Sequence, residues 1–167
     1  GIDPFADYET LLSELKKRGI DPYPGLEEEG PDGCLNLLLS HVIEPTLGQN
    51  RLFVLTHYPA SQAALAQTTH EAGHLVAERF EVYFKGYELA NGYHELADPV
   101  EQEKRLIEAN DHRVKLKKAP LPIDTAFLAA LKKGLPPCCG VAVGFDRLMM
   151  LRHEKNDIKE ILPLDDF

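Results

Sequence analysis

Residues 78–95 read ERFEVYFKGYELANGYHE, and this stretch decides the fold. Aromatic and aliphatic residues in two runs, 79–84 and 87–96, are typical of β-strands. Between the runs, Lys85-Gly86 matches the short turn of a β-hairpin. Strands joined by such a turn pair antiparallel, so the sequence predicts an antiparallel sheet.

Outward from the hairpin, helical and strand patterns fall into separate blocks rather than strict alternation. Apolar spacing, capping residues and Pro or Gly breaks set the expected boundaries. The expected helices cover 7–19, 32–45, 98–117, 124–133 and 146–153; the other expected strands cover 51–56 and 140–144; and 22–33 and 60–67 are expected to be loops. Asp32, Asp98 and Asp124 are the expected N-caps. This order predicts the α+β class, with an antiparallel sheet flanked by helices.

The composition excludes several classes of protein. Of 167 residues, 44% are hydrophobic and 27% are charged, which is ordinary for a globular protein. No apolar run approaches the roughly 20 residues of a membrane span, and no signal peptide is apparent. The net charge of −9 disfavours free-standing binding to nucleic acid. Cys34, Cys138 and Cys139 are odd in number and form no CxxC pair, so we expect a cytoplasmic protein.

One motif, His70-Glu71-Ala72-Gly73-His74, matches H-E-x-x-H, in which two His on one helix face hold zinc and the Glu is the general base. The helix that this motif needs is weak here, because Gly73 lies inside it and a strand-like run follows soon after. A third ligand would have to come from Glu78, His94 or Glu95. A zinc peptidase is therefore an alternative, and a polar loop carrying two His is the favoured interpretation.

Polar side chains repeat along the two hairpin strands. Because side chains alternate between the faces of a strand, Glu81 shares a face with Arg79 and Tyr83. On the second strand one face carries Asn91, Tyr93 and Glu95. Such faces are either solvated or line a wet site, since burying unpaired polar groups is costly. If Glu81 and Glu88 approach each other across the hairpin, they suit Mg²⁺ held jointly with phosphate oxygens.

A third stretch, GVAVGFDRLMML at 140–151, combines a glycine-flanked strand with the start of a helix. The glycines allow another group to lie against the strand. Arg147 opens the helix, where a guanidinium can clamp phosphates or stack on a base. A plain packing turn between strand and helix is the alternative interpretation.

Together, the last two stretches resemble a known family. Residues 140–151 are similar to motif 3 of the class II aminoacyl-tRNA synthetases, and AERFEVYFKGYELANGYHEL at 77–96 resembles the metal and amino-acid strands of the lysyl-tRNA synthetase subgroup. The chain is most similar to the truncated paralogues that attach (R)-β-lysine to a lysine of elongation factor P. This resemblance covers nearly the whole chain, including YPASQAALAQ at 58–67. It implies an ATP-dependent ligase that uses Mg²⁺.

The resemblance also implies roles for individual residues. Glu81 and Glu88 match the carboxylates that hold Mg²⁺ with ATP, and Leu89 falls beside Glu88 at the ATP contact. Gly144 matches the glycine of the adenine pocket, and Arg147 matches the motif 3 arginine that holds ATP. Glu88 and Arg147 are therefore the expected catalytic residues.

The same resemblance assigns the substrate. Asn91, Tyr93 and Glu95 match the strand that recognises a lysine-like molecule, with Glu95 pairing with an ammonium. Ala142 stands where lysyl-tRNA synthetases have the middle glycine of Gly-x-Gly-x-Gly. Its methyl takes space that an α-ammonium needs and a β-amino acid does not, a discrimination of about 1–3 kcal/mol. This favours (R)-β-lysine and elongation factor P over the alternative, a lysyl-tRNA synthetase acting on lysine and tRNA-Lys.

Several parts of the family pattern have no counterpart in these residues, namely motif 1, motif 2 and an anticodon-binding domain. The chain does not begin with Met, and its first five residues match the middle of a paralogue. We therefore expect 1–167 to be one domain, the C-terminal part of a catalytic domain, with a helical and loop lead-in at 1–50 and the sheet and motif 3 at 51–167. The family forms homodimers, and we expect this fragment to perform no adenylation alone.

Overall fold

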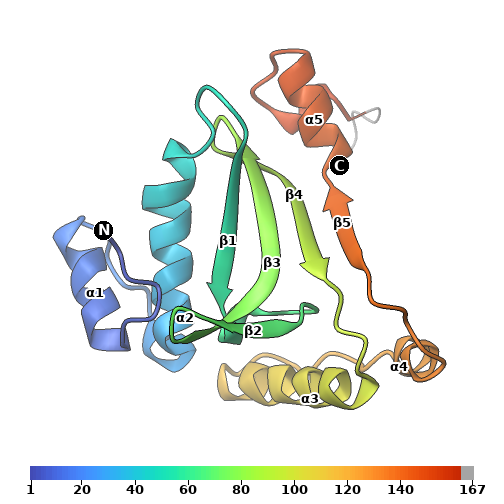
Figure 1. The fold of residues 1–167 in the computed structure, drawn as a ribbon. Coiled ribbons are helices and arrows are strands. Elements are labelled where there is room, and N and C mark those ends of the chain that lie inside the picture. Colours follow the sequence, from blue (N-terminus) through green and yellow to red (C-terminus); the bar gives the residue numbers. More distant parts are fainter. Residues whose placement is uncertain (163–167) are drawn as a thin grey trace.

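The computed structural model, which describes residues 1–162, has five helices arranged around one antiparallel sheet (Figure 1). The strands are β1 (Phe53–Pro59), β2 (Thr68–Glu71), β3 (His74–Phe84), β4 (Tyr87–His94) and β5 (Cys139–Val143). The helices are α1 (Tyr8–Lys17), α2 (Leu26–Leu38), α3 (Pro99–Lys115), α4 (Thr125–Lys132) and α5 (Phe145–Arg152). Four short helical turns complete the described chain: η1 (Leu39–Ile43), η2 (Glu44–Thr46), η3 (Ala60–Gln62) and η4 (Ile158–Glu160). The predicted α+β class is confirmed.

The sheet runs in the order β1-β3-β4-β5, and β2 pairs with the first part of β3. Every pair of strands is antiparallel. The predicted hairpin turn is present at Lys85 and Gly86, whose φ angles are 51° and 78°. Two positive φ angles are what a two-residue hairpin turn of type I′ requires. Helices α1 and α2 lie beside β1, α3 crosses beneath the sheet, and α5 follows β5 at the opposite end (Figure 1).

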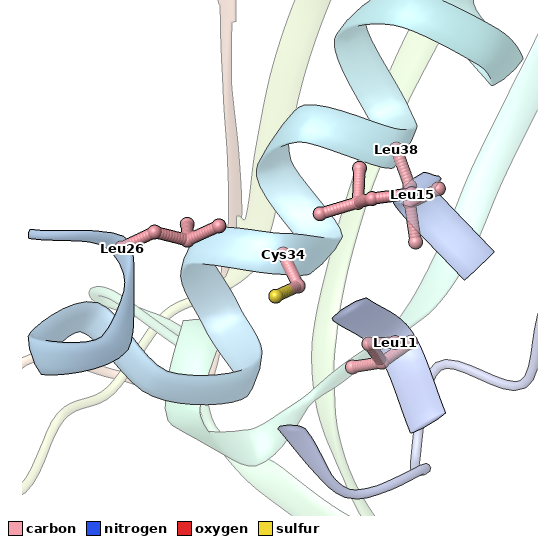
Figure 2. Close-up of a cluster of buried hydrophobic side chains, with 5 residues drawn as sticks. All are labelled: Leu11, Leu15, Leu26, Cys34 and Leu38. Carbon is pink, nitrogen blue, oxygen red and sulfur yellow. The ribbon is translucent and has the colours of Figure 1, made fainter. Parts of the chain in front are cut away.

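Helices α1 and α2 form the most fully buried cluster in the described chain (Figure 2). Its members are Leu11, Leu15, Leu26, Cys34 and Leu38. The first helix starts where Asp7 accepts a hydrogen bond from the Thr10 amide, as expected of an N-cap. It ends at Gly19, with the paired amide-to-carbonyl bonds of a Schellman motif. This cluster anchors the lead-in segment.

The structure corrects the predicted loop at 22–33. Helix α2 already begins at Leu26 and kinks at Gly30, whose φ of 65° and ψ of −151° are not helical. Burial of Leu26 against α1, and the favourable position of acidic residues at a helix N-terminus, stabilise this first turn. Asp32 is consequently inside the helix and is not the predicted N-cap. Its carboxylate instead accepts hydrogen bonds from Ser61 and Gln62.

The structure also corrects the segment from 60 to 74. The predicted loop begins with η3, and the polar stretch after it forms strand β2. β2 and β3 are joined by Ala72 and Gly73, whose φ angles of 50° and 87° form a second tight turn. Strand β3 therefore starts at His74, five residues earlier than predicted. The sequence did not predict this hairpin, because β2 consists of polar residues that do not alternate with apolar ones. Its extended conformation depends on pairing with β3.

The remaining predicted elements agree with the structure to within a few residues. Asp98 and Asp124 cap α3 and α4 through hydrogen bonds to backbone amides, as predicted. Among residues 1–162, no helix combines the length and the apolar character needed to cross a membrane.

Candidate functional site

Strands β3, β4 and β5 bring most of the predicted site residues onto one face of the sheet. In the register, Glu81 lies opposite Asn91, and Asn91 lies opposite Ala142. One step along the same face, Tyr93 lies between Arg79 and Gly140. Directly opposed residues share a face, so a row of polar side chains on β3 and β4 lies beside the small residues Gly140 and Ala142 of β5.

A β-bulge at Leu89 brings Glu88 onto this face as well. Val82 pairs with Ala90 and Tyr83 pairs with Glu88, so β4 contains one more residue than β3 at this point. The extra residue reverses the alternation of β4. Glu88 therefore shares a face with both Tyr83 and Asn91, although it is an odd number of residues from Asn91.

Glu81 is the most constrained carboxylate on the face. It is buried, and it accepts hydrogen bonds from the hydroxyls of Tyr58 and Tyr83 and from the guanidinium of Arg79. Burial, followed by the hydrogen bond to Glu81, raises the pKa of both tyrosines far above the usual range. Both hydroxyls are therefore fixed donors, which hold the carboxylate in one orientation.

Glu88 has a different environment. Its carboxylate is about one-third exposed and lies 3.6 Å from an Arg147 nitrogen. Partial burial raises the pKa of Glu88, the nearby charge of Glu81 raises it further, and Arg147 partly opposes both effects. Glu44 contributes a third negative charge to this corner. When Glu44, Glu81 and Glu88 are all ionised, this corner of the site therefore carries a net negative charge, which a cation would balance.

Arg147 and Gly144 hold the bulge from the side of β5 and α5. Arg147 donates a 2.8 Å hydrogen bond to the backbone carbonyl of Glu88. The Gly144 amide donates to the carbonyl of Leu89 at 2.8 Å. A Cβ at Gly144 would meet ordinary contacts only, the nearest at 3.5 Å. The protein itself thus leaves room beside this glycine, as a ligand pocket needs.

Glu95 occupies the far end of the row, just beyond β4, where an isolated bridge pairs it with Ala66. Its carboxylate lies directly over Gly140, since a Cβ at Gly140 would be 2.1 Å from Glu95 Oε1. No side chain fits there unless the carboxylate moves. The absence of a side chain at Gly140 therefore makes room for the Glu95 carboxylate.

Two cavities open along this row. One of about 270 Å³ lies between β4, β5 and the start of α5, and its lining includes Asn91, Ala142, Gly144 and Arg147. The second, of about 470 Å³, lies on the other side of Glu88 and Arg147, towards Glu44. A further cavity of about 510 Å³ lies between α3 and β2 and contains none of the predicted site residues.

The donor set suits a magnesium ion shared with phosphates better than an all-protein metal cage. Within residues 1–162, no three His, Cys, Asp or Glu side chains gather closely enough to enclose a metal. Glu81 accepts three hydrogen bonds, which leaves one of about four acceptor positions for a cation. Glu88 is the second available carboxylate. Mg²⁺ is commonly held by one or two carboxylates together with substrate phosphates, so these residues fit it.

The zinc alternative is wrong. His70 and Glu71 end β2 and His74 begins β3, so the motif is a hairpin rather than a helix. His70 pairs with Leu75, whereas His74 pairs with Glu71. The two His therefore point to opposite faces of the hairpin and cannot share one ion. The ring of His74 instead stacks on Phe5, with ring centroids 4.0 Å apart.

Five residues that contribute to the site were missing from the predicted set: Glu44, Tyr58, Arg79, Tyr83 and Gly140. Gly140 and Arg79 lie on strands already predicted, and alternation from Glu81 already places Arg79 on the correct face. Tyr58 has no such signal, because β1 reaches Glu81 only through long-range pairing and an irregularity between Thr56 and Tyr58.

Comparison with known proteins identifies relatives of the whole chain. A family described as tRNA synthetases class II (D, K and N) matches residues 37–165. A protein of Haemophilus ducreyi named elongation factor P–(R)-beta-lysine ligase is 46% identical over 97% of this chain and 49% of its own length. Proteins with the same name from Histophilus somni and Pseudoalteromonas translucida are 45% and 42% identical, over 97% and 99% of this chain. The chain spans about half the length of these relatives.

Proposed function

Because the chain belongs to the class II tRNA synthetase family (D, K and N), we propose that its sheet face is the substrate-binding half of an adenylate-forming ligase. In the complete protein, the ligase activates (R)-β-lysine with ATP and transfers it to a lysine of elongation factor P. The names of the relatives support this choice of substrate and acceptor. The free thiols of all three cysteines are compatible with the cytoplasm.

The observation that carries the proposal is the row of side chains from Glu88 through Asn91 to Glu95. At one end of the row, the carboxylates of Glu81 and Glu88 lie near Arg147, which suits a nucleoside triphosphate with its cation. Its other end presents Glu95, which suits an ammonium. A carboxylate substrate with a distant amine would therefore lie along the row with its reacting end at the phosphates.

The chemistry follows from this placement. A carboxylate oxygen of the substrate attacks the α-phosphorus of ATP, the bond to the β-phosphate oxygen breaks, and pyrophosphate leaves. A lysine amine of the acceptor then attacks the acyl carbon, loses a proton and displaces AMP. Bound Mg²⁺ would neutralise phosphate charge, while Arg147 holds the nucleotide and Glu95 fixes the amine. Such catalysis depends mainly on positioning and charge neutralisation.

Ala142 supports the β-amino acid within this proposal. It lies opposite Asn91 and lines the smaller cavity, so its methyl reduces the space beside the substrate's reacting end. A methyl in a pocket is worth about 1–3 kcal/mol in discrimination. We therefore expect (R)-β-lysine to support exchange about 10- to 100-fold better than lysine.

The test uses the full-length protein and ATP–pyrophosphate exchange stimulated by (R)-β-lysine. Glu81→Ala and Glu88→Ala should each abolish exchange, because each removes one of the two carboxylates available to Mg²⁺. Transfer of the activated amino acid to elongation factor P, and not to tRNA-Lys, separates this ligase from a lysyl-tRNA synthetase. Unchanged exchange in both variants would remove the metal assignment.

A further inference from the structure

Arg79 has more contacts across the site than any role assigned so far explains. Its side chain is only 12% exposed. One guanidinium nitrogen donates to Glu81 Oε1, and the other donates to the backbone carbonyl of Gln62 at 3.0 Å. The side chain therefore joins β3 to the η3 turn.

The guanidinium also lies between two aromatic rings. Its central carbon is 4.2 Å from the centroid of the Tyr58 ring and 5.7 Å from that of Tyr93. Both distances are within the roughly 6 Å range of cation–π attraction. Tyr58 also donates its hydroxyl to Glu81, so Arg79, Tyr58 and Glu81 form a closed set of mutual contacts.

We propose that Arg79 is a positioning residue that ties the Glu81 carboxylate to the Tyr93 ring, and so sets the spacing between the cation end and the ammonium end of the row. This inference rests on the proposed function. Glu81 is held at one oxygen by Arg79, and Tyr93 has Arg79 as its cross-strand partner. Movement of this one side chain would displace the Glu81 carboxylate and the Tyr93 ring together.

The planar shape of arginine is essential to this role. A lysine supplies one point charge, which can still pair with Glu81. It cannot extend a flat surface between two rings while also donating to Gln62. The two functions of Arg79 are therefore separable by substitution, which gives the proposal a specific signature.

The experiment measures pyrophosphate exchange in the full-length protein while Mg²⁺ and (R)-β-lysine are varied independently. Arg79→Met should raise both the half-saturating Mg²⁺ concentration and the KM for the amino acid by about 10-fold or more. Arg79→Lys should restore the Mg²⁺ dependence to within about threefold, yet leave the KM raised, since only the charge is replaced. The matched control is Arg51→Met, which removes an exposed arginine and should change neither value.

A second measurement is independent of activity. In the NMR spectrum, the Arg79 Nε–H, which is buried and has no acceptor among the described residues, should exchange slowly and shift upfield beneath the rings. The absence of this signal in Arg79→Met assigns it to Arg79, and Tyr93→Leu should change its chemical shift. If the wild-type protein shows no pyrophosphate exchange, the proposed function fails. The NMR signal of the Arg79 Nε–H then decides the positioning role by itself. A freely exchanging, unshifted Nε–H, or equal kinetic effects of Lys and Met, would overturn the proposal.

Discussion

The close approach of Glu95 to Gly140 allows a prediction with a calculable magnitude. A Cβ introduced by Gly140→Ala would lie 2.1 Å from Glu95 Oε1. Ordinary contact requires the carboxylate to withdraw by roughly 1.3 Å or more. Backbone strain is not involved, because Gly140 does not have a positive φ. The substitution therefore acts on the position of one charge.

The energetic cost follows from Coulomb's law. At an effective dielectric constant of about 20, lengthening an ammonium–carboxylate distance from about 3 Å to about 4.3 Å weakens the attraction by roughly 1.7 kcal/mol. A weakened hydrogen bond to the charged group adds to this loss. We expect Gly140→Ala to raise the KM for (R)-β-lysine by about 10- to 100-fold. The KM for ATP should change little, because Glu88 and Arg147 lie at the other end of the row.

The assay is pyrophosphate exchange in the full-length protein with the amino acid varied. Val141→Ala is the control, since Val141 is exposed and pairs with Gly92, on the opposite face from Gly140. The double variant Gly140→Ala/Glu95→Asp shortens the carboxylate by one methylene and makes room for the new methyl. It should lose less than the sum of the two single changes. A KM within twofold of wild type for Gly140→Ala would refute the placement of the ammonium at Glu95.

Three further predictions concern the chain itself. Residues 1–167 alone should release no measurable pyrophosphate and should bind Mg-ATP at millimolar affinity or weaker in a calorimetric titration, since the family resemblance assigns none of these residues to the motif 2 arginine; micromolar binding with turnover would contradict this. Glu88→Gln should raise the melting temperature at pH 7.5, because a raised pKa in the folded state means that ionised Glu88 is destabilising; this advantage should shrink as the pH falls through that pKa and vanish by pH 4, and a difference that grows in acid would reverse the sign of the argument. Gly48→Ala should lower the free energy of unfolding by about 2–4 kcal/mol in urea titrations, because Gly48 has a φ of 66° and its Cβ would lie 2.5 Å from the Tyr83 carbonyl; an unaffected midpoint would show that this loop relaxes freely.

The sequence predicted correctly those helices and turns whose ends depend on neighbouring residues in the chain. Asp98 and Asp124 cap helices through their own neighbours, and Lys85-Gly86 closes a turn by itself. The first turn of α2 was not predictable in this way, because Leu26 is held by burial against α1. Strand β2 was not predicted for a similar reason, since its polar residues adopt an extended conformation only by pairing with β3.

The site shows the same division between local and long-range causes. The resemblance to motif 3 and to the lysyl strands predicted site residues that lie together on one face of the sheet, because these motifs are long enough to fix their positions in the chain. What it could not supply was the support around them. Tyr58 comes from β1, more than twenty residues before Glu81, and contacts it only after β1 has paired with β3. No spacing rule connects such a residue to the site.

The bulge at Leu89 explains why simple alternation would not bring the predicted residues together on one face of the sheet. Extended regularly from the turn, the hairpin would pair Glu81 with Ala90, and Asn91 would point to the opposite face. A slip of one residue reverses every side chain beyond it, so the residues that we propose to bind the substrate amine would be separated from the carboxylates by the sheet itself. At the bulge, the carbonyl of Glu88 accepts a hydrogen bond from Arg147, and the carbonyl of Leu89 accepts one from the Gly144 amide. Arg147 thus stabilises the backbone irregularity that brings the two halves of the row together, in addition to the contact with nucleotide that we propose for it.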